Sequence, residues 1–247
     1  MFLRLLVFFC FLASHVTAAD AASLVKDALA AEARLDSAGA LALFLQADAA
    51  QPGDAFILQK IAKQYSDMVP DQNSDAAKKD LATRALDYAQ RSFELEPTNA
   101  VHALSLAICH GHLAVVGDIR TKVEYSRLIK TETERALELD PNYAWAHHLL
   151  GRWHYEVASL GPAARFLARI FYGGIPPASV DKGIAHLERA TELEPDELNH
   201  WVDLGFAYAA ADRMPDARTA WKRGLAMPNR GKHDPAAKHR ARDALAR

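Results

Sequence analysis

The chain has 247 residues, of which 50% are hydrophobic and 24% are charged. Its 29 Lys and Arg residues nearly balance 31 Asp and Glu residues, which gives a formal net charge of −2. This balance argues against nucleic acid as a partner, because nucleic-acid-binding domains carry an excess of basic residues. The length is sufficient for one large domain or one repeat array.

The first 18 residues predict a secretory signal peptide. Arg4 is their only charged residue, and the apolar run Leu5–Ala13 is shorter than the roughly 20 residues that span a bilayer. Val16-Thr17-Ala18 has the small residues of a cleavage site. We therefore expect residues 1–18 to be removed, leaving a secreted or periplasmic protein that is not an integral membrane protein. An uncleaved short anchor is the alternative.

Three short segments of the chain are near copies of one another. Each ends in an acid, a leucine, a second acid and a proline, and each closes an Ala-rich amphipathic run. Recurrence of this kind predicts a stacked repeat structure. The segments are Phe93–Pro97, Leu137–Pro141 and Thr191–Pro195.

Prolines at the ends of successive units set the length of each repeat. Their spacings are 45, 44, 54 and 33 residues, and the prolines are Pro52, Pro97, Pro141, Pro195 and Pro228. A tetratricopeptide repeat has about 34 residues in two antiparallel helices. The last spacing matches, and the longer ones predict insertions between the two helices of a unit. We expect an all-α, tetratricopeptide-like α-solenoid of four to five helical hairpins over residues 19–228.

The first units differ in the character of their predicted insertions. Ala40, Phe44 and Ala47 indicate the second helix of an N-terminal hairpin, with its first helix over about residues 22–37. Polar residues over 67–79 predict an exposed loop in the next unit. Gly117-Asp118 predicts a short break within 115–122, followed by a helix over 123–135.

The longest insertion covers residues 158–181. Phe166, Leu167, Ile170 and Phe171 share one helical face there, with Arg165 and Arg169 on another side, and Gly173–Pro177 ends the helix. Two interpretations are open. The apolar face packs against the concave side or a neighbouring helix, or it enters a lipid interface.

The final unit carries the repeat pattern most fully. Large residues surround small ones, which lets the two helices approach closely. Its first helix has Trp201, Leu204, Gly205 and Tyr208 at the W-x2-L-G-x2-Y spacing, and its second has Ala217 and Trp221. In the basic tail, 229–247, Asp234-Pro235 predicts a capping helix over 236–246 that closes the array with a polar face.

A longer motif makes a family resemblance specific. Residues 151–160 read G-R-W-H-Y-E-V-A-S-L, and residues 171–177 read F-Y-G-G-I-P-P. With the helix between them, they resemble the regulator of microtubule dynamics family from about Ala85 to the C-terminus. The resemblance implies a helical repeat domain without known catalysis, microtubule association in animal members, and lipid binding in one. A signal peptide in place of that family's anchor indicates a bacterial-type secreted relative.

The repeat register predicts which side chains face the inner groove. They occupy the second, fifth, ninth, twelfth and thirteenth positions of each first helix. This mixture of aromatic and polar residues suits a peptide, a partner helix or an amphiphile, although its apolar members could simply cover the insertions. The candidate partner-binding residues are Phe56, Lys63, Leu104, His112, Trp145, His148, Arg152, Tyr155, Asn199 and Phe206.

One residue in this set, Arg152, suggests an anion anchor. Arg152 and Glu156 are one helical turn apart, so they are expected to pair. Alternatively, the planar fork of Arg152 could hold a carboxylate or phosphate of a ligand. Cys109, the one cysteine that remains after signal cleavage, lies in an apolar helical pattern and is expected to be a buried small residue.

The histidines do not predict a metal site. His147, His148 and His154 lie close together in the sequence, but no carboxylate or cysteine completes a recognisable ligand set. His147, His154 and His110 occupy packing positions of the repeat, so we expect buried or half-buried side chains.

No catalytic motif or cofactor-binding motif is present in the sequence. We therefore expect a non-catalytic interaction module or scaffold that binds a peptide or partner helix in its groove, with no cofactor and no metal. The alternative is a lipid- or amphiphile-binding protein that uses the groove together with Phe166–Phe171.

Overall fold

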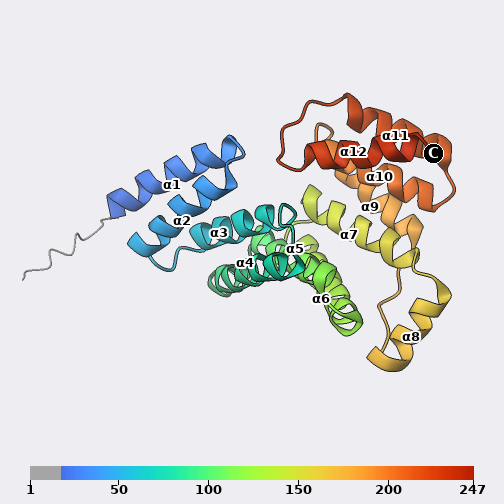
Figure 1. Ribbon diagram of the computed structural model, residues 1–247, viewed down its shortest axis with the longest axis horizontal. Helices are drawn as coiled ribbons and strands as arrows, with labels where there is room; N and C mark the ends of the chain where they lie inside the picture. The colour runs from blue at the N-terminus through green and yellow to red at the C-terminus, as the bar shows by residue number, and fades with distance from the viewer. Residues whose placement is uncertain (1–17) are drawn as a thin grey trace, which may run out of the picture.

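The computed structural model describes residues 18–247, which form twelve helices and no strand (Figure 1). The expected all-α repeat fold is confirmed over this range. Residues 1–17, with most of the predicted signal peptide, lie outside it. Five helical hairpins pack in sequence: α1 (Ala18–Ala33) with α2 (Ser37–Ala50), α3 (Ala55–Met68) with α4 (Asp75–Leu95), α5 (Ala100–Val116) with α6 (Ile119–Leu139), α7 (Ala144–Ala158) with α9 (Val180–Leu193), and α10 (Leu198–Ala210) with α11 (Met214–Ala226).

Two helices stand apart from this pairing. α8 (Pro162–Tyr172) lies between α7 and α9 in the sequence and packs against α6. α12 (Asp234–Leu245) covers α10 and α11 at the end of the array. It corresponds to the helix expected over 236–246, and it begins two residues earlier because Pro235 fits the first helical turn.

The extra residues of the second and third hairpins lengthen helices instead of forming insertions. The loop expected over 67–79 is short, since α3 continues to Met68 and α4 begins at Asp75 with Ser74 capping it. The Ser74 side chain accepts a hydrogen bond from the backbone N–H of Ala77. Likewise, α6 begins at Ile119 because Asp118 caps it. The two breaks are shorter than predicted because Ser74 and Asp118 cap the second helices early, and helix-forming Ala and Lys residues over 76–79 extend α4.

Small residues mark the closest helix crossings, as expected for the final unit. A methyl group on Gly205 of α10 would lie 2.4 Å from the indole ring of Trp221 in α11, and Trp221 is buried. Gly151 of α7 and Gly183 of α9 face each other in the same manner, each too close to the other's carbonyl oxygen to carry a side chain. Gly183 was not singled out in the sequence.

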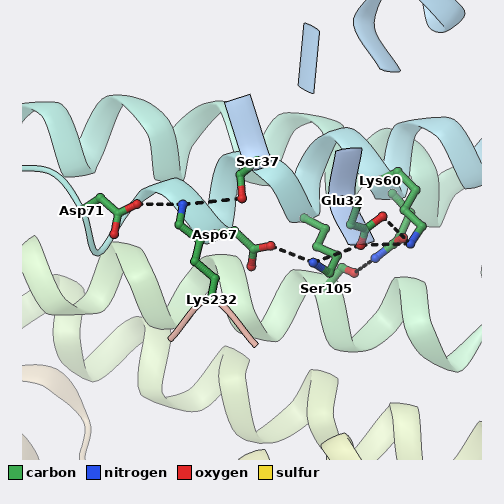
Figure 2. A network of polar contacts seen from close by, with 9 residues as sticks. Glu32, Ser37, Lys60, Asp67, Asp71, Ser105 and Lys232 are labelled. Carbon is green, nitrogen blue, oxygen red and sulfur yellow. Dashed lines mark hydrogen bonds and ion pairs between the residues drawn. The ribbon is translucent and has the colours of Figure 1, made fainter. Parts of the chain in front are cut away.

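The array curves until its end meets its beginning (Figure 1). Lys232, in the loop before α12, lies 2.7 Å from the carboxylate of Asp71 and donates a hydrogen bond of 3.5 Å to Ser37 Oγ. Asp71 follows α3 and Ser37 begins α2, so a contact across 195 residues links the two ends of the superhelix (Figure 2).

No helix in residues 18–247 is long and apolar enough to cross a membrane.

Candidate partner-binding face

The start of each first helix confirms the register used to predict the inner groove. α3, α5, α7 and α10 each begin three residues after the proline that ends the preceding unit. A short turn separates the proline from the helix each time, and the polar caps Asp54 and Asn99 bind the first free N–H groups of α3 and α5. Equivalent positions on the four helices can therefore be compared directly.

The second, ninth and thirteenth positions remain accessible to solvent. Phe56 and Val101 are exposed at the second position, and Trp145 and Asn199 are half-buried there. The ninth and thirteenth positions are half-buried or exposed in all four helices; they are Lys63, Ile108, Arg152 and Phe206, and Asp67, His112, Glu156 and Ala210. We call these twelve residues the inner face.

The fifth position is buried in every first helix, in contrast to the prediction. Gln59, Leu104, His148 and Val202 occupy it. Their side chains contact the neighbouring unit: Gln59 donates a hydrogen bond to Ser105 of α5, and Leu104 packs with Ala146 of α7. Leu104 and His148 therefore hold adjacent units together and form a floor beneath the inner face. Tyr155, at the twelfth position of α7, is also buried.

Ion pairs occupy alternate units of the inner face. Lys63 and Asp67 lie 2.7 Å apart on α3, and Arg152 and Glu156 lie 2.7 Å apart on α7, which confirms the expected pairing. The intervening helix α5 has Ile108 and His112 at the same two positions, and α10 has Phe206 and Ala210. The ninth-position row therefore alternates a cation with an apolar residue along the array.

A second network fixes the N-terminal end of the inner face (Figure 2). Glu32 of α1 lies 2.9 Å from Lys60 Nζ and 3.1 Å from Lys63 Nζ. Burial by itself would lower the pKa of Lys63, but the carboxylates of Asp67 and Glu32 together raise it above its usual value. Glu32 was absent from the predicted set because it belongs to the preceding hairpin.

The most deeply buried charge in this region was not predicted. Asp203 of α10 is almost fully buried, with His148 Nε2 at 3.2 Å and Arg240 Nη1 of α12 at 3.1 Å from its carboxylate oxygens. Burial would raise its pKa, but the hydrogen bond from His148 and nearby arginines hold the pKa well below the usual range. The available signal was a single acid flanked by Val202 and Leu204 in an otherwise buried helix.

Two histidines extend this buried network. His148 Nδ1 and His200 Nδ1 are 3.0 Å apart. If His148 donates to Asp203 through Nε2 and carries no proton on Nδ1, that Nδ1 accepts a hydrogen bond from the N–H at His200 Nδ1. Burial, reinforced by His148, lowers the pKa of His200 to about 3. His148 is therefore a structural histidine in this fold, with Trp145 packed against both rings.

The loop before α12 covers one edge of the inner face. Burial lowers the pKa of His112 to about 4; the Asp67 carboxylate opposes this shift, whereas nearby His233 and Arg152 reinforce it. His112, His233 and Arg152 belong to α5, the 231–233 loop and α7, so three elements converge at this edge. Asn199 is also engaged there, since its side chain donates to Asp234 and Glu197. Apart from Asn199, the residues at the second and ninth positions have no contact with this edge among the hydrogen bonds and ion pairs of the 231–234 segment.

The remaining histidines and the cysteine have structural surroundings. His110 is buried, with Nδ1 2.8 Å from Glu132, and His154 is buried as expected. His147 Nδ1 contacts His186 Nδ1 at 2.9 Å, across the α7–α9 pair. Cys109 is buried beside Ser66, and burial raises the pKa of its thiol to about 12. Such a thiol is not a nucleophile at neutral pH. Within residues 18–247, no group of three potential ligands could hold a metal ion.

Comparison with known proteins places this arrangement in a family. A family model described as Regulator of microtubule dynamics protein 1-3 matches residues 24–247. The chain belongs to this family. The α7–α8–α9 region, whose sequence resembled the family, thus lies inside the matched range.

Curated members of the family align with part of the chain. Regulator of microtubule dynamics protein 1 of Bos taurus is 29% identical over 144 residues, which cover 58% of this chain and 45% of the relative. Regulator of microtubule dynamics protein 3 of Xenopus laevis is 31% identical over 138 residues, covering 56% and 30%. The alignments thus span less than half of either relative.

A solved structure shows the same fold. TTC0263, a tetratricopeptide-repeat protein of Thermus thermophilus, superimposes with a TM-score of 0.68 over 92% of this chain and 100% of its own. The identity is 18%, so the likeness concerns the fold alone. The fold is one whose stacked repeats create extended concave surfaces for binding other molecules.

Proposed function

We propose that the protein is a non-catalytic scaffold whose inner face binds a peptide or a helix of a protein partner. The observation that carries the proposal is the difference in burial between positions along the first helices. Their fifth positions are buried between units, while their second and ninth positions stay accessible. A rigid floor with accessible side chains allows binding without a large loss of conformational entropy.

The ninth-position row suggests the chemistry of the partner. Lys63 and Arg152 lie two units apart with Ile108 between them. Packed helices are about 10 Å apart, so the two cations are separated by roughly 20 Å along the array. An extended peptide covers this distance in about six residues. We therefore favour a peptide with acidic residues about six positions apart and an apolar residue between them.

The existing ion pairs do not prevent a carboxylate of the partner from binding these cations. Arg152 and Glu156 are both about half exposed, and such pairs contribute at most about 1 kcal/mol. A carboxylate of the partner could therefore replace Glu156 as the neighbour of Arg152. The guanidinium would still be able to bind it through two hydrogen bonds.

Selection from a random-peptide library followed by affinity measurement tests this proposal. Peptides selected on the wild-type protein should bind Arg152→Glu at least about tenfold more weakly, since a charge-assisted hydrogen bond is worth about 1.5–3 kcal/mol. Arg84→Glu is the matched control, because Arg84 forms the same kind of pair with Asp80 on α4, at 3.0 Å. Equal affinity of both variants would refute binding at the inner face.

Lipid or amphiphile binding is the second candidate function. The exposed apolar side of α8 favours it. However, α8 packs against α6, which is the second helix of the α5–α6 hairpin. A ligand held between α8 and the inner face would therefore require α8 to move. Mass spectrometry of lipid extracts from the purified protein distinguishes the two candidates. Co-purified acyl chains would support this candidate, whereas their absence together with peptide binding would support the first.

We also propose that the protein acts outside the cytoplasm, on the basis of residues 1–18. A fusion of the full chain to alkaline phosphatase, which is active only after export, should be active in a bacterial host. Deleting residues 1–18 should abolish that activity while leaving the amount of fusion protein unchanged. Full activity after the deletion would contradict export through this segment.

A further inference from the structure

α8 presents an apolar surface that nothing in residues 18–247 covers. Phe166 is 62% exposed, Leu167 49%, Ile170 58% and Phe171 68%. These four residues lie on one side of an 11-residue helix, following the spacing i, i+1, i+4 and i+5. A side-by-side set of large exposed apolar residues marks an interaction site more often than isolated ones do.

The outward orientation of this side is fixed by specific contacts. Ala168, on the opposite side of the helix, is the buried residue of α8. At the N-terminal end, Arg165 donates hydrogen bonds to the carbonyl oxygens of Val157 and Ala158. The apolar residues therefore stay exposed while α8 is anchored at its other side.

The C-terminal end of α8 is held equally firmly. Gly173 and Gly174 both adopt positive φ angles, which end the helix abruptly. Arg127 of α6 then donates hydrogen bonds to the carbonyl oxygens of Tyr172 and Gly174. Arg127 thus clamps the last turn of α8 to α6.

The charge on α8 and along the adjoining part of α6 is predominantly positive. α8 itself contains Arg165 and Arg169 and no acidic residue. A hollow of about 560 Å³ between α8 and α6 is lined by Arg120 and Arg127, with Glu124 as its one acid among the lining residues, and by Phe171 and Tyr172. Figure 1 shows α8 projecting from the array.

We propose that α8 is a docking arm that inserts Phe166, Leu167, Ile170 and Phe171 into the interface of an anionic lipid bilayer. Large apolar residues beside arginines, without acids, are the features of helices that lie in a membrane interface. Arg169 and Arg120 then face the phosphate groups of the lipids. A second copy of the chain is less favoured as occupant, because two α8 helices would bring their arginines together. This role does not depend on peptide binding at the inner face.

A tryptophan placed on α8 tests insertion directly in the full-length protein. In F171W, tryptophan emission should shift to shorter wavelength on adding vesicles of phosphatidylcholine that contain a third of phosphatidylglycerol. Brominated acyl chains should quench that emission. The matched control is L95W, because Leu95 of α4 is 51% exposed on a helix without this apolar side. The proposal would be overturned if vesicles left the tryptophan emission of F171W unchanged, or if brominated chains quenched the emission of L95W to the same extent.

Further variants separate insertion from other associations. Replacing Phe166 by Ser in F171W should weaken vesicle binding about tenfold, as expected when one buried aromatic side chain is lost. Arg169→Glu should reduce binding to the anionic vesicles more than binding to pure phosphatidylcholine. A concentration-dependent shift of F171W emission without vesicles, together with a dimer in sedimentation, would assign this side to self-association and overturn the proposal.

Discussion

The α10–α11 hairpin and the inserted helix α8 treat large aromatic residues in opposite ways. Trp221 of α11 is 2% exposed and packs on Gly205 of α10, whereas Phe171 of α8 is 68% exposed. The repeat residues are constrained by contacts inside the chain, and each small residue faces a large one. The large residues of α8 satisfy no such contact within residues 18–247. Their identity therefore reflects a requirement outside the packing of the array.

Removing each aromatic side chain provides the sharpest test of this difference. Trp221→Ala should lower the free energy of unfolding by about 3–5 kcal/mol, because it leaves a cavity in the core. Phe171→Ala should change it by less than about 0.5 kcal/mol, as expected at an exposed position. Urea denaturation monitored by circular dichroism measures both values. Comparable losses in the two variants would show that α8 packs more tightly than its exposure indicates.

Filling a helix crossing should have the next largest effect. Gly205→Ala should cost about 1–3 kcal/mol, because the new methyl group would overlap the ring of Trp221. Gly111→Ala is the control, since a methyl group there meets no atom within 4 Å and alanine favours the helix by up to about 1 kcal/mol. Thermal unfolding of the two variants should therefore move in opposite directions. If both gained stability equally, helix propensity and not close packing would govern Gly205.

The buried histidines should make the stability of the array sensitive to acid. Helix α8 has no titratable carboxyl or imidazole group and should not contribute to this sensitivity. Burial lowers the pKa of His200 to about 3 and that of His186 to about 4, below the value of about 6.5 in an unfolded chain. The unfolded state consequently binds more protons below pH 6.5, so stability falls as the pH decreases from there towards the folded-state pKa values.

Urea midpoints at pH 7 and pH 4.5 measure this effect. Asp203, whose pKa is depressed, loses its contribution only at lower pH, so it does not add to this interval. The wild type should lose stability on the order of 2 kcal/mol for each of these two histidines between these values, and His200→Asn should lose less. His239→Asn is the control because His239 is 75% exposed, and it should keep the wild-type dependence. An unchanged dependence in His200→Asn would contradict the contribution of buried His200 to this acid sensitivity.

Breaking the contact between the two ends of the array should have the smallest effect on stability. Lys232 and Asp71 form a partly exposed pair, so Lys232→Asp should cost less than about 1 kcal/mol. The shape should respond more, with a larger radius of gyration in small-angle X-ray scattering, because this contact links distant units. The swap Asp71→Lys with Lys232→Asp should restore the wild-type value. A radius of gyration that both substitutions leave unchanged would show that hairpin packing alone sets the curvature.

Much of the repeat architecture was predictable from local patterns. The prolines at 52, 97, 141 and 195 placed the first helices, because each begins three residues after its proline. The ion pair between Arg152 and Glu156 and the buried Cys109 also follow from helical spacing and residue size. These features depend on residues near one another in sequence, where backbone geometry fixes the distances.

Other features depended on which helices came together in space. The burial of Leu104 and His148 arises from contact between successive units, and the Asp203 network joins α7, α10 and α12. The contact of Lys232 with Asp71 depends on the summed rotation of every hairpin, which no local pattern records. The sequence by itself determined the helices, their register and the amphipathic character of α8. Only the tertiary structure decided which of those faces are covered, because burial depends on neighbours that lie far away along the chain.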